Sequence, residues 1–228
     1  MRHLSAALAC EGRTDFKFLA PLLGRVLEEA AMTIEGMVDI GDLVPVLSGT
    51  GQINPGAHTN QKDEVTAAFS MGHVSAEILF VHADASGDIE SCRKNHVEPV
   101  ERALKDKSLE PLVCGVLPDR EIEAWMLADT DSLAWLWSTG VDLSRSVLPP
   151  GRVGEISDPK QKLWELAESV DTGRGRRRPV RRRGGRVDQA YDNLGLEIDL
   201  DQLRCVPSFC DMESRLKSLV RQIGNADG

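Results

Sequence analysis

The sequence LSAALACEGRTDFKFL, residues 4–19, decides the fold of this chain. Residues 4–9 are mostly apolar and have the length of a buried strand, and a glutamate and a glycine follow closely. Thr14 or Asp15 can then cap a helix whose apolar residues recur every three or four positions. Glu11 is a carboxylate just after a strand, which is where open α/β sheets build their binding sites.

Two later segments repeat this arrangement of an apolar run followed by acids. Residues 78–81 precede Asp84 and Asp88, and residues 112–117 precede Glu123. Near-continuous apolar runs that alternate with helical patterns predict a parallel sheet covered on both faces. The carboxyl ends of parallel strands share one edge, so we expect these acids to form a divalent-metal site.

The order of these patterns predicts two parts of the chain. Residues 1–130 form an α/β domain with about four strands flanked by helices, in which residues 43–47 are another strand. Only helical patterns follow Pro118, so residues 131–228 are predicted as an all-helical C-terminal extension. No apolar run approaches the roughly 18 residues that cross a bilayer. The five scattered cysteines are typical of reduced thiols, and we expect a cytoplasmic protein without a membrane partner.

The net charge of −9 hides an uneven distribution. Eight arginines and no acid lie in a segment predicted to be flexible, residues 174–186: Arg174, Arg176, Arg177, Arg178, Arg181, Arg182, Arg183 and Arg186. Without these eight, 19 basic residues face 36 acidic ones in the rest of the chain. Such a basic arm on an acidic body favours binding to a nucleic-acid backbone. A solvated loop, or an arm docked on an acidic surface, is the alternative.

Each acid also has an ordinary structural interpretation. Asp15 and Asp88 suit helix caps, whereas Glu11 precedes a glycine and has a capping residue nearby already. His82 lies two residues before Asp84 and is either a metal ligand, a general base or a strand-end residue without a catalytic role. The last is favoured because imidazole is poorly matched to magnesium.

The residues around the first strand and its acid resemble a known family. Glu11-Gly12-Arg13-Thr14-Asp15 after a first strand, with acids after a later strand, resembles the TOPRIM domain of topoisomerases, bacterial primases and overcoming-lysogeny-defect nucleases. It is most similar to small bacterial TOPRIM-like proteins and the RloB group. Glu123-Ala124-Trp125 resembles their glutamate-x-tryptophan helix, and Asp158-Pro159-Lys160 resembles a further element. The likeness spans about residues 1–170. The family's Asp-x-Asp pair is replaced here by Asp84 and Asp88, four positions apart.

The resemblance implies a metal-dependent nuclease, a hydrolase that uses Mg²⁺ or Mn²⁺ on DNA or RNA. Glu11 and Asp84 would hold the metal, and Asp15, Asp88 and Glu123 would complete its surroundings. The implied catalytic residues are Glu11, Asp84, Glu123 and Lys160. Arg120 is an alternative to Lys160 for stabilising charge on phosphorus. The resemblance further implies a prokaryotic anti-phage defence system with an ATPase partner of the ABC or AAA type, and a homo-oligomer is possible.

A second hypothesis makes the chain a catalytically silent adaptor that grips a partner protein through its fold and its arginine arm. The interrupted acid pair at Asp84 and Asp88 favours this alternative. A third, a nucleotidyl or phosphoryl transferase, requires a nucleotide pocket for which the sequence offers no motif.

Overall fold

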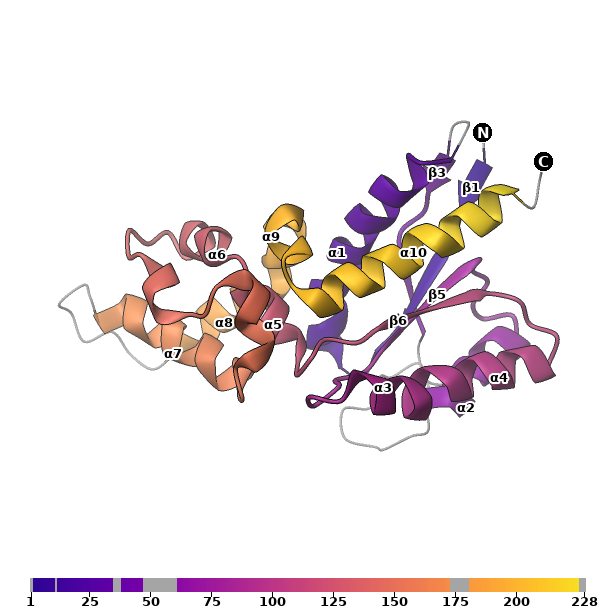
Figure 1. Ribbon diagram of the computed structural model, residues 1–228, viewed down its shortest axis with the longest axis horizontal. Helices are drawn as coiled ribbons and strands as arrows, with labels where there is room; N and C mark the ends of the chain where they lie inside the picture. The colour runs from indigo at the N-terminus through magenta and orange to yellow at the C-terminus, as the bar shows by residue number, and fades with distance from the viewer. Residues whose placement is uncertain (1, 11, 35–37, 47–60, 173–180, 226–228) are drawn as a thin grey trace.

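Four parallel strands in the order β4–β2–β5–β6 form the sheet at the centre of the fold (Figure 1). The computed structural model describes residues 2–10, 12–34, 38–46, 61–172 and 181–225. A short parallel pair, β1 with β3, accompanies the four-stranded sheet. The strands are β1 Arg2–Leu4, β2 Ala6–Ala9, β3 Val38–Ile40, β4 Val44–Pro45, β5 Ile78–His82 and β6 Leu112–Val116. The predicted α/β class, with about four parallel strands and C-terminal helices, is confirmed.

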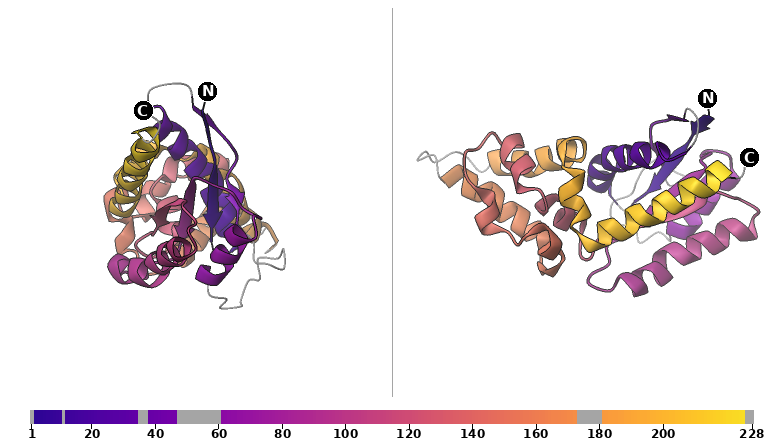
Figure 2. Two further views of the ribbon diagram at one scale, coloured as in Figure 1. Left: turned by 90° about the vertical axis from the view of Figure 1, so that its right-hand side faces the viewer. Right: turned by 45° about the horizontal axis from the view of Figure 1, so that its top comes forward.

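Helices connect and cover these strands. The α-helices are α1 Arg13–Ala31, α2 Gln61–Ser70, α3 Ile89–Cys92, α4 Glu98–Asp106, α5 Ile122–Leu127, α6 Thr130–Leu136, α7 Pro159–Thr172, α8 Arg181–Glu197, α9 Leu200–Arg204 and α10 Pro207–Asn225. A π-helical turn, Arg93–Val97, joins α3 to α4, and two 3₁₀ turns, Leu143–Ser146 and Pro150–Glu155, precede α7. Figure 2 shows the sheet edge-on between two helical layers.

Both faces of the sheet are buried, as strand β5 shows. Ile78 and Phe80 belong to the core beneath α1 and α10, whereas Leu79 and Val81 belong to the core beneath α2 and α4. Successive side chains of a strand point to opposite faces, so an unbroken apolar run is what a two-sided sheet requires.

Helix α1 begins at Arg13 with Gly12 as its N-cap, earlier than the predicted cap at Thr14 or Asp15 would place it. The Asp15 carboxylate accepts a hydrogen bond from the Gly12 backbone N–H over 2.9 Å, which satisfies a donor at the helix start. The buried face of α1 includes Phe18, Leu19 and Leu22 and packs on the sheet. Asp15 is thus held at the first turn of α1 by the residue that precedes the helix.

The C-terminal helices do not all extend away from the sheet. Helices α5 to α8 form a lobe at one end of the molecule, but α10 returns and lies beside α1 on the sheet (Figure 1). One apolar core runs through both regions, and Trp125 meets Phe209 edge-to-face with ring centroids 5.3 Å apart. The boundary at residue 130 stays a prediction, and the core is continuous across it.

The arginine-rich segment is only partly described. Arg181, Arg182 and Arg183 are the first three residues of α8 and Arg186 is the sixth, so from Arg181 onward the segment is helical where a flexible arm was predicted. The guanidinium of Arg186 donates to the Trp137 carbonyl over 2.9 Å, and the Trp137 indole donates back to the Arg186 carbonyl. These bonds join the start of α8 to α6.

Two further expectations concern the cysteines and the membrane. All five cysteines lie in the described ranges as thiols; Cys92 and Cys114 are buried, and Cys205 and Cys210 are exposed. Within those ranges, no helix combines the length and the apolar character that a bilayer crossing needs.

Candidate functional site at the carboxyl edge of the sheet

The loops after β5 and β6 run side by side at the carboxyl edge. Strand register pairs Ala9 with Val81 and His82 with Val116, so the three strands end at one level. Beyond the strands, the Ala85 amide donates to the Pro118 backbone carbonyl over 3.2 Å, and the Gly87 amide donates to the Asp119 backbone carbonyl over 2.6 Å. The edge therefore has a fixed backbone on which acidic and basic side chains are mounted.

Arg120 lies against the loop that carries Asp84. Its guanidinium donates to the Ser86 carbonyl over 3.3 Å, and its Cζ would lie 3.2 Å from a Cβ added at Gly87. Gly87 also has a φ of +96°, a conformation that side chains disfavour. Glycine at this position thus allows a cation to lie close beside the Asp84 loop.

Asp84 is an exposed acid of this edge, and it faces a buried histidine. The Asp84 side chain is 41% exposed, and its Oδ1 lies 3.6 Å from Nε2 of His82, whose side chain is 2% exposed. The other ring nitrogen of His82, Nδ1, bonds the Val116 carbonyl over 2.9 Å. The structure therefore places Asp84 at the predicted strand end, with the buried His82 imidazole on its protein side.

Two other predicted metal ligands cap helices. Asp88 is the N-cap of α3, where its carboxylate accepts from the Ser91 amide over 2.9 Å. Asp15 accepts from Gly12 as described above, and it is half-buried. These contacts match the capping alternative for both residues.

Glu123 is buried inside the helical part of the edge. It is 4% exposed, and the Tyr191 hydroxyl of α8 donates a hydrogen bond to its Oε1. Burial raises the pKa of Glu123 above its usual range, although the bond from Tyr191 and the charge of Lys160 oppose this. Burial also raises the pKa of Tyr191, and the charges of Glu123, Asp15 and Glu121 add to that rise.

The Glu123 region thus brings three predicted residues into one electrostatic neighbourhood: Asp15, Glu123 and the exposed Lys160. Glu121 joins them. Its Oε2, like Nε of Arg120, is a buried atom that has no hydrogen-bond partner in the described part of the chain. Buried polar atoms are normally paired, so an unpaired carboxylate oxygen marks a place suited to a cation or a proton.

Glu11 and four of the arginines, Arg174, Arg176, Arg177 and Arg178, lie outside the described residues. Within the described ranges, no three His, Cys, Asp or Glu side chains are placed to hold one metal ion. The donors at the edge are carboxylate oxygens and one imidazole, a chemistry that fits a hard or borderline divalent cation.

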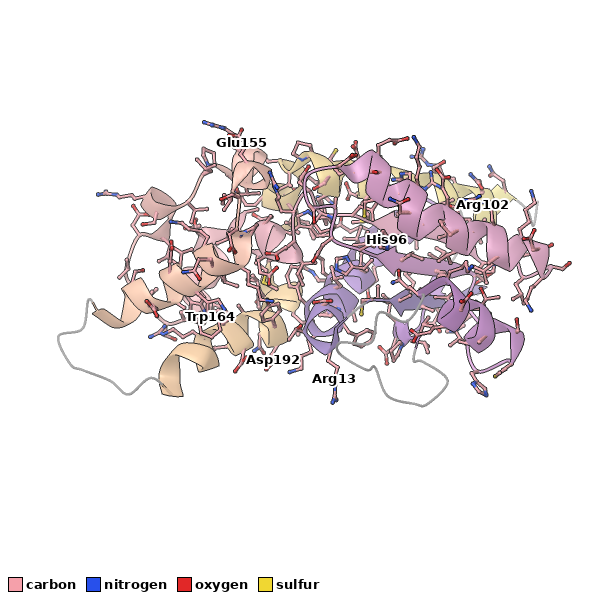
Figure 3. All side chains as sticks on the ribbon, turned by 90° about the horizontal axis from the view of Figure 1, so that it is seen from below. Arg13, His96, Arg102, Glu155, Trp164 and Asp192 are labelled. Atoms are coloured by element: carbon pink, nitrogen blue, oxygen red, sulfur yellow. The ribbon has the colours of Figure 1, made fainter. Side chains whose placement is uncertain are left out.

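Figure 3 places the beginning of α1 in its surroundings. In this view Arg13 points outward at the lower edge below α1, with Asp192 of α8 to its left and His96 above it. Lys17 on α1 pairs with Asp192 over 2.6 Å, so α8 is tied to α1 beside the candidate site. The edge is consequently bordered by the helical lobe on one side.

Sequence reasoning missed Tyr191 and Glu121. Tyr191 is the sole tyrosine of the sequence, and Val187, Ala190 and Leu194 recur around it at helical spacing. This spacing predicts a buried tyrosine, and a buried hydroxyl needs a polar partner. The sequence could have indicated the need for a partner, but not that the partner is Glu123.

Comparison of this chain with protein-family models, with curated proteins and with solved structures returned no match. Its function is therefore argued from the residues of this edge.

Proposed function

We propose that this chain is a metal-dependent nuclease that hydrolyses phosphodiester bonds of DNA or RNA. The observation that carries the proposal is the position of Asp84. It is an exposed carboxylate at the carboxyl end of a central parallel strand, with the Arg120 guanidinium packed on the same loop. Ligand sites of open α/β sheets form at this edge, and an acid beside an arginine suits a metal-bound phosphate.

The proposed roles follow from the surroundings of each residue. Asp84, together with Glu11, holds a divalent ion, which when bound polarises a phosphodiester and lowers the pKa of a water molecule. Arg120 is half-buried and aligned by the Ser86 carbonyl, so it is oriented to bind a phosphate oxygen. Lys160 is exposed and supplies a second positive charge near Glu123.

Glu123 suits a proton-transfer role better than a metal-ligand role. Its carboxyl is buried and its pKa is raised by that burial, so it keeps a proton at a higher pH than an exposed glutamate does. A carboxyl of this kind can donate a proton to a leaving oxygen. Tyr191 holds the carboxyl in one orientation.

The arginine-rich segment is proposed to contact the nucleic-acid backbone. Arg186 is bonded to Trp137, so the proposed contribution comes from the arginines that precede it, residues 174–183. Each lost phosphate contact should lower the salt slope of binding by about 0.9 on B-DNA. Replacing Arg174, Arg176, Arg177 and Arg178 with glutamine should therefore flatten the slope, while Arg186→Gln should leave it unchanged. An unchanged slope in the fourfold variant would contradict this role.

The defence setting and the ATPase partner rest on the TOPRIM resemblance alone.

The test of the proposal is cleavage by the purified full chain. Plasmid, single-stranded DNA and tRNA are incubated with Mg²⁺ or Mn²⁺, with EDTA as the metal-free control, beside Glu11→Gln. We expect metal-dependent cleavage of one substrate class, lost in the variant. Undiminished cleavage by a folded Glu11→Gln protein would overturn the assignment.

The adaptor hypothesis keeps one specific observation in its favour. Glu123 is buried and bonded to Tyr191, and one oxygen of Asp88 already accepts a bond as a helix cap. Thermal unfolding with and without Mn²⁺ separates the two functions. Metal at about 100 times its dissociation constant should stabilise the nuclease by about 2.7 kcal/mol. An adaptor without a metal site should show no shift.

A further inference from the structure

The ring of His82 is held in one orientation by the strand beside it. Nδ1 lies 2.9 Å from the Val116 carbonyl oxygen, and a carbonyl only accepts hydrogen bonds, so the Nδ1 proton must point there. The pairing of His82 with Val116 in the sheet sets this geometry, and the side chain is 2% exposed. Nε2 is consequently the nitrogen that faces the candidate site.

Nε2 faces the carboxylate of Asp84 at a distance that suits an intervening ion. The separation from Oδ1 is 3.6 Å, which is too long for a hydrogen bond. A divalent ion between the two atoms would have both as ligands, because an imidazole nitrogen and a carboxylate oxygen are each common metal ligands. The exposed side of Asp84 gives such an ion a route from solvent.

We infer that His82 Nε2 and Asp84 Oδ1 are two ligands of one divalent ion, and that the site prefers Mn²⁺ or a later transition metal to Mg²⁺. Imidazole suits transition metals, whereas Mg²⁺ takes oxygen ligands. Metal-binding histidines almost always donate their second N–H to a carbonyl or a carboxylate, as His82 does to Val116. The inference rests on the proposed function for its site and assigns that site a nitrogen ligand.

The chain offers a matched control for this assignment. His96 lies in the π-helical turn Arg93–Val97, away from the strand that carries His82, and it is exposed (Figure 3). His82→Gln removes the proposed nitrogen ligand, and His96→Gln makes the same chemical change away from the edge. Asp84→Asn removes the proposed oxygen ligand.

The experiment is Mn²⁺ binding by the full, untagged chain, measured by titration and by pulsed electron paramagnetic resonance. We expect a nitrogen coupling on bound Mn²⁺ in the wild type and in His96→Gln, and its loss in His82→Gln. Loss of an outer-shell partner typically weakens metal binding by about 10- to 100-fold, so loss of this ligand should raise the dissociation constant for Mn²⁺ by at least about 10-fold in His82→Gln. Mg²⁺ should bind more weakly than Mn²⁺ to the wild type.

Two results would overturn the inference without touching the proposed nuclease. One is bound Mn²⁺ with no nitrogen coupling in the wild type; the other is His82→Gln binding Mn²⁺ as the wild type does. If His82→Gln fails to fold, the wild-type coupling decides the matter, with ¹⁵N-labelled histidine as the identifying control. Absence of Mn²⁺ binding together with absence of cleavage would overturn the inference and the proposed function alike. Nitrogen-coupled Mn²⁺ without cleavage would support the site and contradict the nuclease.

Discussion

Two glutamates of this chain, Glu123 and Glu213, are equally buried, each 4% exposed, yet they lie in opposite electrostatic surroundings. Glu213 on α10 accepts from the Arg204 guanidinium over 2.7 Å and pairs with the Lys217 ammonium over 3.1 Å. Burial opposes its ionisation, but these bonds win and lower the pKa of Glu213. Glu123 has a tyrosine hydroxyl instead, and burial raises its pKa.

The two glutamates differ in how completely their surroundings pair the charges around them. Arg204 also bonds Asp201 over 2.7 Å and pairs with Glu29, so the Glu213 network joins α1, α9 and α10. Its charges are satisfied, and buried ion pairs of that kind serve the fold. In the Glu123 neighbourhood, Glu121 Oε2 has no hydrogen-bond partner among the described residues, and burial, together with the charges of Glu123, Asp15 and Glu121, raises the pKa of Tyr191. Perturbed, incompletely paired groups of that kind are typical of functional sites.

The largest loss of stability is expected when the packing of α8 against α1 is disrupted, because α8 carries the Tyr191 that bonds Glu123. A Cβ added at Gly195 of α8 would lie 2.2 Å from the Phe18 carbonyl oxygen, so Gly195→Ala must push α8 away from α1. We expect a loss of about 3 kcal/mol in the free energy of unfolding, measured by urea denaturation. Gly185→Ala on the same helix meets nothing within 4 Å and should stabilise by about 1 kcal/mol. Equal effects of the two changes would contradict the close α1–α8 contact.

Next in size is the removal of the Glu213 partner. Arg204→Ala leaves a buried carboxylate with Lys217 alone, and we expect a loss of about 2 kcal/mol because Arg204 is itself only partly exposed. Arg215→Ala is the matched control, since its pair with Glu101 is exposed and should contribute about 0.5 kcal/mol. If both variants lost the same small amount, the network would not hold the helices together.

A smaller loss is expected for the corresponding change beside Glu123. Tyr191→Phe deletes one hydroxyl and leaves the Glu123 carboxyl without the donor from α8, which should cost about 1 kcal/mol. The cost should grow with pH, because the bond from Tyr191 favours the ionised carboxyl. Urea denaturation at several pH values measures this. A cost that shrinks as pH rises would show that the hydroxyl does not bond a carboxylate.

The finest distinction is the sign of each glutamate's pH dependence. The pKa of Glu123 is higher in the folded chain than in the unfolded chain, where it has its ordinary value of about 4.3. The free energy of unfolding therefore falls as pH rises from the unfolded pKa through the folded pKa. Glu213 has a lowered pKa, so its contribution is present above that ordinary value and is lost as pH falls through the folded one. Glu123→Gln should therefore flatten a decline at rising pH, and Glu213→Gln should flatten a decline at falling pH. If stability depended on pH in the same way in both variants, the two glutamates would not differ as described.

Much of the sheet was predictable from sequence because its central strands are continuous apolar runs. The predicted strand 78–81 is observed with one more residue, as Ile78–His82. The first strand, predicted over residues 4–9, is instead divided around Ser5, whose amide bonds the Glu77 carboxylate. The pairing of β1 with β3 was missed because Val38–Ile40 is too short to show a period.

Of the candidate site, the sequence predicted the position of a residue that lies shortly after a strand. Asp84 lies at the carboxyl edge for that reason, since parallel register is enough to place it. Tyr191 meets Glu123 across 68 positions of sequence, through the packing of α8 in the helical lobe. No local pattern carries that information. The orientation of the His82 ring likewise depends on a carbonyl of the neighbouring strand.

The central claim is that Asp84 binds the metal ion that cleavage requires. Asp88 is the matched control. Both are exposed aspartates of one loop, but Asp88 caps α3, a role that asparagine fills equally well. The measurement is the Mn²⁺-dependent cleavage rate of Asp84→Asn and Asp88→Asn beside the wild type. We predict a fall on the order of 100-fold or more for Asp84→Asn, as loss of a metal ligand implies, and a change within about threefold for Asp88→Asn. Wild-type cleavage by a folded Asp84→Asn protein would contradict the account.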